Sequence, residues 1–76
     1  MKVRVFGLPD CPKCIMLRDF LKEHKVKFED LNVKDEGVAR EMITKSGQKS
    51  VPVIEIDDEI IVGFDEEELL VELDLD

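Results

Sequence analysis

Apolar positions recur along this chain with two different periods. Short runs rich in valine and isoleucine predict strands, whereas longer stretches with apolar residues three or four positions apart predict helices. Prolines and glycines separate the two kinds of segment. The predicted strands are 2–6, 26–33, 51–56 and 59–63, and the predicted helices are 12–24, 35–47 and 65–73.

The first predicted helix, 12–24, has one apolar and one charged side at helical spacing. The apolar side carries Ile15, Met16, Leu17, Phe20 and Leu21. The charged side, which we expect to face outward, carries Arg18, Asp19, Lys22 and Glu23. Pro12 suits the first helical position, where its missing N–H costs nothing.

The element order β-α-β-α-β-β-α predicts an α/β fold. A β-α-β unit crosses over right-handed and places its two strands parallel. The strands 51–56 and 59–63 are joined by an acidic turn, so they add an antiparallel hairpin, and their nearly continuous apolar positions predict burial on both faces. We expect a single domain over 1–76, with three helices covering both faces of a four-stranded mixed sheet.

Composition narrows the class of function. The net charge of the 76 residues is −8, which argues against binding to nucleic-acid phosphates or to anionic membranes. No apolar run approaches the ~20 residues that span a bilayer. Lys2 and Arg4 interrupt the first apolar stretch, so we expect no secretory signal and a cytoplasmic location.

The two cysteines lie in the sequence CPKC at the start of the first predicted helix. Cys11 then falls at the N-cap and Cys14 one turn inside. Free N–H groups and the helix dipole favour a thiolate there, and positions i and i+3 are close enough for a disulfide. Lys13 adds a positive charge, while Asp10 opposes ionisation of Cys11.

Two other interpretations of the cysteine pair stay open. A closed zinc site needs four ligands, and His24 lies ten residues beyond Cys14 on the same helix, about 15 Å away at ~1.5 Å per residue. A metal site would therefore have to be shared between two chains. The pair could also be two inert small apolar residues. A redox role is favoured, because the pair opens a helix within a β-α-β pattern.

Three stretches in order resemble the glutaredoxins and glutaredoxin-like redoxins of the thioredoxin superfamily: CPKC, KSVPVI (49–54) and VGFDEEEL (62–69). The resemblance implies a thioredoxin-like fold, catalysis by Cys11 and Cys14, and a cis Val51–Pro52 bond with the backbone of Val51 open to an extended substrate. It also implies a glutathione site in which N–H groups near Phe64 and Asp65 bind a carboxylate and Lys49 binds another. The implied substrate-binding residues are Pro12, Lys13, Lys49, Val51, Pro52, Phe64 and Asp65.

This resemblance predicts a monomeric thiol–disulfide oxidoreductase without a bound cofactor or metal. Its substrates would be protein or small-molecule disulfides, and its electron donor glutathione as co-substrate or a reductase. Leu8 and Val62 stand where many glutathione users carry a lysine and a glycine, so we expect glutathione to be a slow donor. The alternative is a module that handles a metal or an iron–sulfur cluster through Cys11 in a dimer.

Overall fold

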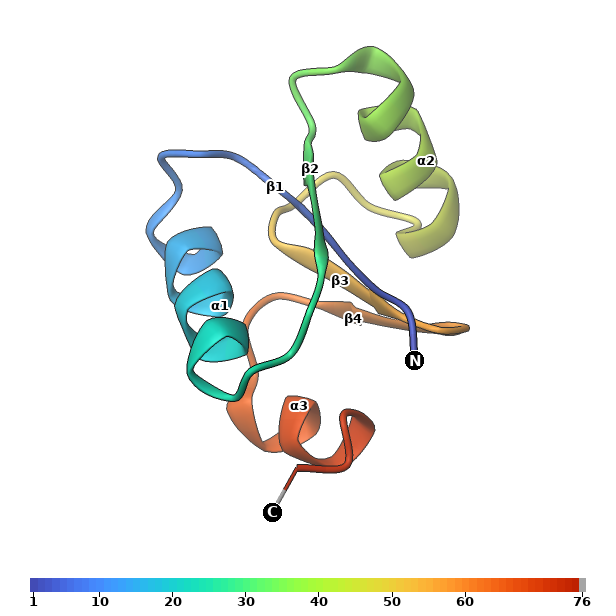
Figure 1. The fold of residues 1–76 in the computed structure, drawn as a ribbon. Coiled ribbons are helices and arrows are strands. Elements are labelled where there is room, and N and C mark those ends of the chain that lie inside the picture. The colour runs from blue at the N-terminus through green and yellow to red at the C-terminus, as the bar shows by residue number, and fades with distance from the viewer. Residues whose placement is uncertain (76) are drawn as a thin grey trace.

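The computed structural model describes residues 1–75, so only the last residue of the predicted domain lies outside it. Strands and helices follow one another in the predicted order (Figure 1). The elements are β1 (Val3–Gly7), α1 (Pro12–Glu23), β2 (Glu29–Asn32), α2 (Glu36–Ser46), β3 (Val53–Ile56), β4 (Glu59–Val62) and α3 (Glu66–Glu72). None of the described helices is long and apolar enough to cross a membrane.

The four strands form one mixed sheet in the order β2-β1-β3-β4. β1 is central and runs parallel to β2 and antiparallel to β3, and β4 completes a hairpin with β3. Phe6 pairs with Leu31 on one side and with Val53 on the other. The predicted four-stranded mixed sheet is therefore confirmed.

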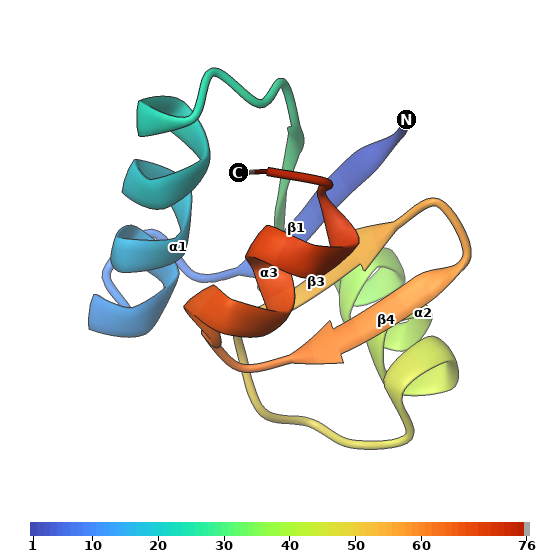
Figure 2. The same cartoon turned by 90° about the horizontal axis from the view of Figure 1, so that it is seen from below.

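The helices lie on the two faces of the sheet, as predicted. α1 and α3 share one face, and α2 covers the other (Figures 1 and 2). The larger core lies under α1 and α3 and includes Val5, Leu17, Leu21, Ile54 and Leu69. The smaller core, under α2, consists of Phe6, Met42 and Val53 with half-buried neighbours.

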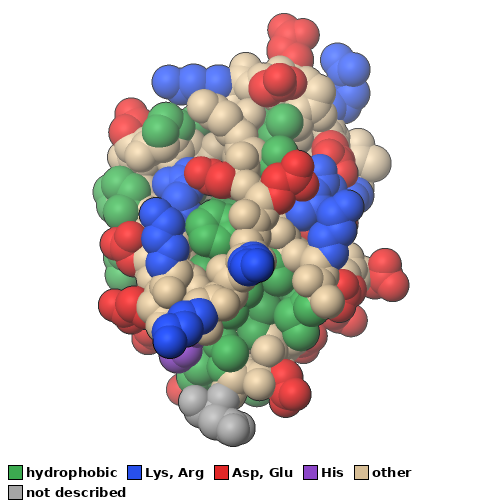
Figure 3. All heavy atoms as spheres, in the orientation of Figure 1, with side chains coloured by type: hydrophobic (Ala, Val, Ile, Leu, Met, Phe, Trp, Pro, Cys, Tyr) green, Lys and Arg blue, Asp and Glu red, His purple; other side chains and the backbone are tan. Residues whose placement is uncertain are grey.

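Some predicted details of burial are wrong. Ile15 is 42% exposed and Met16 53% exposed, because α1 rests on the sheet along a narrower stripe than its apolar side suggested. Arg18, which we expected to face outward, has only 13% of its side chain exposed. Val62 is 48% exposed, so β4 is not covered on both faces as predicted, and Ile61 is its buried residue. Figure 3 shows acidic and basic side chains interspersed over one face, with hydrophobic side chains in its lower half.

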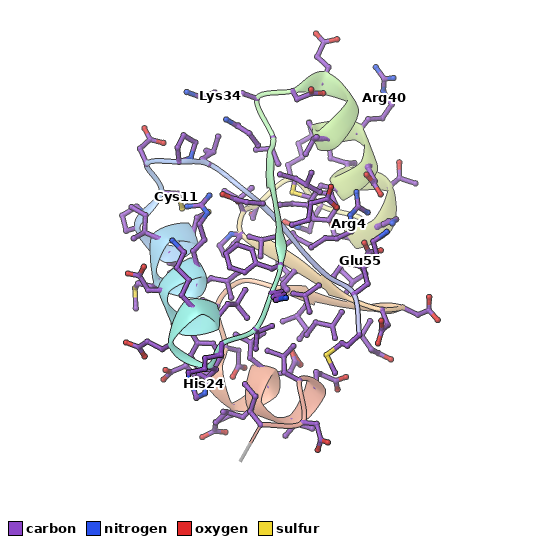
Figure 4. The ribbon with its side chains drawn as sticks, viewed as in Figure 1. Arg4, Cys11, His24, Lys34, Arg40 and Glu55 are labelled. Atoms are coloured by element: carbon purple, nitrogen blue, oxygen red, sulfur yellow. The ribbon has the colours of Figure 1, made fainter. Side chains whose placement is uncertain are left out.

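A network of ion pairs ties α2 to the strands beneath it. Arg4 of β1 binds Glu41 of α2 and Glu55 of β3 at 2.6 and 2.9 Å, and Lys45 of α2 binds Glu55 at 2.6 Å. Arg4 also binds Glu29 of β2 at 3.1 Å. Figure 4 shows Arg4 and Glu55 on this side of the molecule, away from Cys11. Glu55 is only 9% exposed, so its charge depends on these partners.

Candidate active site at the start of α1

The first turn of α1 brings the two cysteines together. Cys11 is the N-cap in extended backbone conformation, and its carbonyl accepts the N–H of Ile15 at 2.9 Å. Pro12 begins the helix, and Pro12 and Lys13 are exposed between the cysteines. Cys11 is partly exposed, whereas Cys14 is fully buried, and both are free thiols. The two cysteines are 3.3 Å apart, which agrees with the prediction that they share the first turn of a helix.

Local hydrogen bonds favour the thiolate of Cys11. The backbone N–H of Cys14 has the largest effect and lowers the pKa of Cys11, and the Cys14 thiol and the N–H of Lys13 lower it further. Partial burial and the charge of Asp10 act in the opposite direction but do not cancel the shift. A lowered pKa increases the share of the thiolate, which is the nucleophilic form of a partly exposed cysteine.

The surroundings of Cys14 favour its neutral thiol. Burial raises the pKa of Cys14, and the hydrogen bond and negative charge of Cys11 raise it further. The N–H of Leu8 and the charge of Arg18 lower the Cys14 pKa but are outweighed. Cys11 is therefore the accessible cysteine with the lowered pKa, and Cys14 is the buried cysteine with the raised pKa.

The burial of Cys14 depends on the missing side chain of Gly7, which the sequence analysis did not single out. A Cβ atom on Gly7 would lie 2.8 Å from the Cys14 Sγ and 3.3 Å from its Cβ. Only a glycine lets β1 approach the sulfur so closely. The sequence did contain a signal for this contact, because Gly7 directly follows the first predicted strand and lies four residues before Cys11.

Three segments of the candidate site leave the sheet at the same end. Because Phe6 pairs with Val53 and Val53 with Val62, the loop before Cys11, the Val51–Pro52 turn and the start of α3 lie at one end of the sheet. Val51–Pro52 is cis, which confirms the expectation. The carbonyl of Pro52 accepts the N–H of Gly63 at 2.8 Å and joins the second and third segments.

The remaining predicted binding residues have different surroundings. Asp65 caps α3 and accepts the N–H of Glu68 at 3.2 Å. Phe64 is half-buried and packs edge-on against Phe20 of α1, with ring centres 5.8 Å apart. Lys49 is exposed in the loop between α2 and β3.

No group of three or more histidine, cysteine, aspartate or glutamate side chains within residues 1–75 could hold a metal ion. His24 ends α1 and stacks on Phe20, with ring centres 4.4 Å apart. Figure 4 shows His24 and Cys11 at opposite ends of the helix. A metal site using Cys11 would therefore need ligands from a second chain.

Comparison with known proteins gives consistent matches. Residues 3–61 match the family model described as Glutaredoxin. A glutaredoxin-like 8.6 kDa protein in the rubredoxin operon of Clostridium pasteurianum is 41% identical, covering 88% of this chain and 91% of the relative. The glutaredoxin-like protein NrdH of Lactococcus lactis is 31% identical, covering 88% and 93%. The crystal structure of a glutaredoxin from Archaeoglobus fulgidus is 31% identical, with a TM-score of 0.88 and coverage of 95% and 85%.

Proposed function

Because the chain belongs to the glutaredoxin family, whose members are thiol–disulfide oxidoreductases, we propose that Cys11 and Cys14 form its dithiol active site. The observation that carries this assignment is the contrast between two cysteines 3.3 Å apart. Cys11 is partly exposed with a lowered pKa, and Cys14 is buried with a raised pKa. Such a pair suits an attacking and a resolving thiol.

The reaction proceeds in two exchanges. The Cys11 thiolate attacks one sulfur of a target disulfide, forms a mixed disulfide and releases the other target sulfur as a thiolate. Cys14 then loses its proton and attacks the Cys11 sulfur. The Cys11–Cys14 bond forms, the bond to the target breaks, and the departing thiolate takes up a proton. The target gains two electrons, and an external dithiol or two thiols restore the reduced protein.

We expect substrates to lie along the end of the sheet that carries the cysteines. An extended disulfide-containing segment would pair with the backbone of Val51, as in strand addition. Protein disulfides meet this requirement, and a small-molecule disulfide meets it where it carries peptide groups. Exposed Pro12 and Lys13 would contact the segment beside the cysteines.

The residues that the family resemblance assigns to glutathione suit that ligand less well than the cysteine side of the site suits a disulfide. The Asp65 carboxylate already accepts an N–H within its own helix. Leu8 offers no cation, and the side chain of Val62 is 48% exposed where many glutathione users have glycine. Lys49 remains available for a carboxylate. We therefore propose that a dithiol donor, such as a thioredoxin-reductase-type enzyme, reduces the protein faster than glutathione does.

Matched cysteine variants test the dithiol assignment. Cys11→Ser should abolish reduction of any disulfide, whereas Cys14→Ser should still attack and should accumulate a mixed disulfide with a protein target. Mass spectrometry under non-reducing conditions distinguishes the two. Retained turnover in Cys11→Ser, or a mixed disulfide through Cys14, would contradict the assignment. Metal content and colour of freshly purified protein test the alternative, a cluster held by Cys11 in a dimer.

A further inference from the structure

Arg18 lies beneath the cysteines and connects three segments. Its Nη2 donates to the carbonyl of Leu8 at 2.8 Å, and its Nε donates to Asp30 of β2 at 3.0 Å. The side chain is 13% exposed, although Arg18 was predicted to lie on the outer side of α1. Its guanidinium is therefore fixed in place rather than free in solvent.

The guanidinium is also close to the sulfur of Cys14. A Cβ built on Gly7 would lie 2.8 Å from the Cys14 Sγ and 3.4 Å from the Arg18 Nη2. These two atoms are thus within about 6 Å of each other, the range over which an opposite charge shifts a pKa. Leu8 completes the arrangement, because its N–H lowers the pKa of Cys14 while its carbonyl accepts from Arg18.

The charges around Cys14 change after the first exchange. In the reduced protein the Cys11 thiolate raises the pKa of Cys14. In the mixed disulfide the Cys11 sulfur carries no charge, so that opposition disappears. The charged groups that remain near the pair are Lys13 between the cysteines, Arg18 with its partner Asp30, and Asp10, whose charge acts on Cys11. Burial is then the remaining effect that raises the pKa of Cys14, and the Leu8 N–H and Arg18 act against it.

We propose that Arg18 is a positioning residue for the second exchange, holding the Leu8 loop against Cys14 and stabilising the Cys14 thiolate when it attacks the mixed disulfide. This role rests on the dithiol exchange proposed above. The first exchange, by Cys11, does not need it. Cys14 thereby stays protonated while it waits and becomes nucleophilic when Cys11 has reacted.

The expected effect is moderate. Asp30 and a small hollow of about 200 Å³ lined by Pro9, Arg18, Asp30 and Asn32 place opposite charge and solvent beside the guanidinium. We expect loss of the charge to raise the titration midpoint of Cys14 by about 0.5–1 unit. A thiolate of higher pKa is also more nucleophilic, so the second exchange should slow only about two- to fourfold below that midpoint.

The first test measures the Cys14 thiolate directly. In a Cys11→Ser background, which removes the competing charge, the ultraviolet absorbance of the thiolate is followed against pH. Arg18→Gln should raise the midpoint, and Arg18→Lys should restore most of it. Asp30→Asn should lower it, because the guanidinium is then no longer paired. Arg40→Gln is the matched control, since Arg40 is exposed on α2 and far from Cys11 (Figure 4).

The second test separates the two exchanges in protein with both cysteines. Reduced protein in excess is mixed with an aromatic disulfide whose thiolate product is coloured, so that the attack by Cys11 and the attack by Cys14 each release one coloured thiolate. Arg18→Gln should leave the first phase unchanged and slow the second about two- to fourfold near pH 7. Above the titration midpoints of both proteins the slowing should disappear and reverse slightly, because Cys14 is then ionised in both and its thiolate is more nucleophilic in the variant.

Three outcomes decide between the explanations. If folded Arg18→Gln has the same Cys14 titration midpoint and the same rate of the second exchange as the unaltered protein, the proposed role of Arg18 is wrong. If that variant does not fold, a midpoint that Asp30→Asn leaves unchanged or raises would overturn it instead. Absence of both phases in the unaltered protein would overturn the dithiol function itself, which is a separate failure.

Discussion

At the scale of single residues, Gly7 determines how close β1 can lie to Cys14, the proposed resolving cysteine. Its Cα borders the buried sulfur, and the space that a side chain would fill is already occupied by Cys14 and by Arg18. The surrounding core is tightly packed, so an added methyl group cannot be absorbed without moving α1 or the strand.

Gly7→Ala should therefore destabilise the protein and disturb the site together. Overpacking of this kind costs roughly 1–3 kcal/mol, which a shift in the denaturant midpoint would reveal. We also expect faster alkylation of Cys14, because α1 must move away from β1. Gly37→Ala is the matched control. Its new Cβ would meet only the Asp35 carboxylate at 3.3 Å, and alanine is favoured over glycine inside a helix. Equal stability changes in the two variants would contradict this account.

At the scale of elements, α2 is held by charge as much as by apolar contact. Within residues 1–75, the buried apolar residues of the core under α2 are Phe6, Met42 and Val53. Arg4 and Lys45 surround the carboxylate of Glu55, and Arg4 also lies 5.2 Å from the ring centre of Phe6. The ion pairs thus stabilise the contact between α2 and the sheet, which the small apolar core alone provides only in part.

Arg4→Met should cost about 3 kcal/mol in the free energy of unfolding, because Glu55 would be left buried with Lys45 as its remaining partner. Glu29→Gln removes only the outermost pair of the same arginine and should cost less than about 1 kcal/mol. Chemical denaturation of both variants measures the difference. A cost for Arg4→Met no larger than that for Glu29→Gln would show that the network does not hold α2.

The same network predicts how stability depends on acid. Bonds from Arg4 and Lys45 lower the pKa of Glu41 to about 2, and the pKa of Glu55 is also lowered, by Lys45 and Arg4 against the effect of burial. Groups with depressed folded-state pKa values stabilise the protein fully above their unfolded values, about 4.5, and lose that contribution as the pH falls toward about 2. The free energy of unfolding should decline over this window, and less steeply in Arg4→Met.

Local patterns were enough to predict the elements, and long-range contacts account for what was missed. Helical spacing and the proline after Cys11 placed the cysteines at a helix start, and three short motifs identified the family and the cis Val51–Pro52 bond. The burial of Arg18 could not be predicted, because its partners Leu8 and Asp30 lie on other elements. The exposure of Ile15 and Met16 likewise depends on how α1 is seated on the sheet.

At the scale of the whole molecule, the net charge of −8 acts on every charged partner that approaches the cysteines. Glutathione is anionic at neutral pH, so its encounter with the protein is slowed by repulsion that salt screens over ~10 Å at 0.1 M. A neutral dithiol feels no such force. The loop before Cys11, the Val51–Pro52 turn and the start of α3 would have to recognise a partner through contacts at short range.

Turnover of one disulfide substrate should consequently be slow with glutathione and its reductase, and faster with a thioredoxin-reductase-type donor at matched electron supply. Raising the salt concentration should speed the glutathione reaction, while reduction by the neutral dithiol dithiothreitol should stay constant as an internal control. Efficient turnover with glutathione, and none with any dithiol donor, would show that Leu8 and Val62 do not weaken glutathione binding.

The short distance between the two cysteines also bears on oxidative damage. A thiolate such as that of Cys11 is the form that peroxides convert to sulfenic acid, and a second oxidation gives a sulfinic acid that ordinary thiols cannot reduce. Cys14, 3.3 Å away and shielded from the same oxidant, can condense with the sulfenic acid and release water. The product is the Cys11–Cys14 disulfide, the same bond that the electron donor reduces in the proposed reaction. The buried thiol thus makes the exposed one repairable.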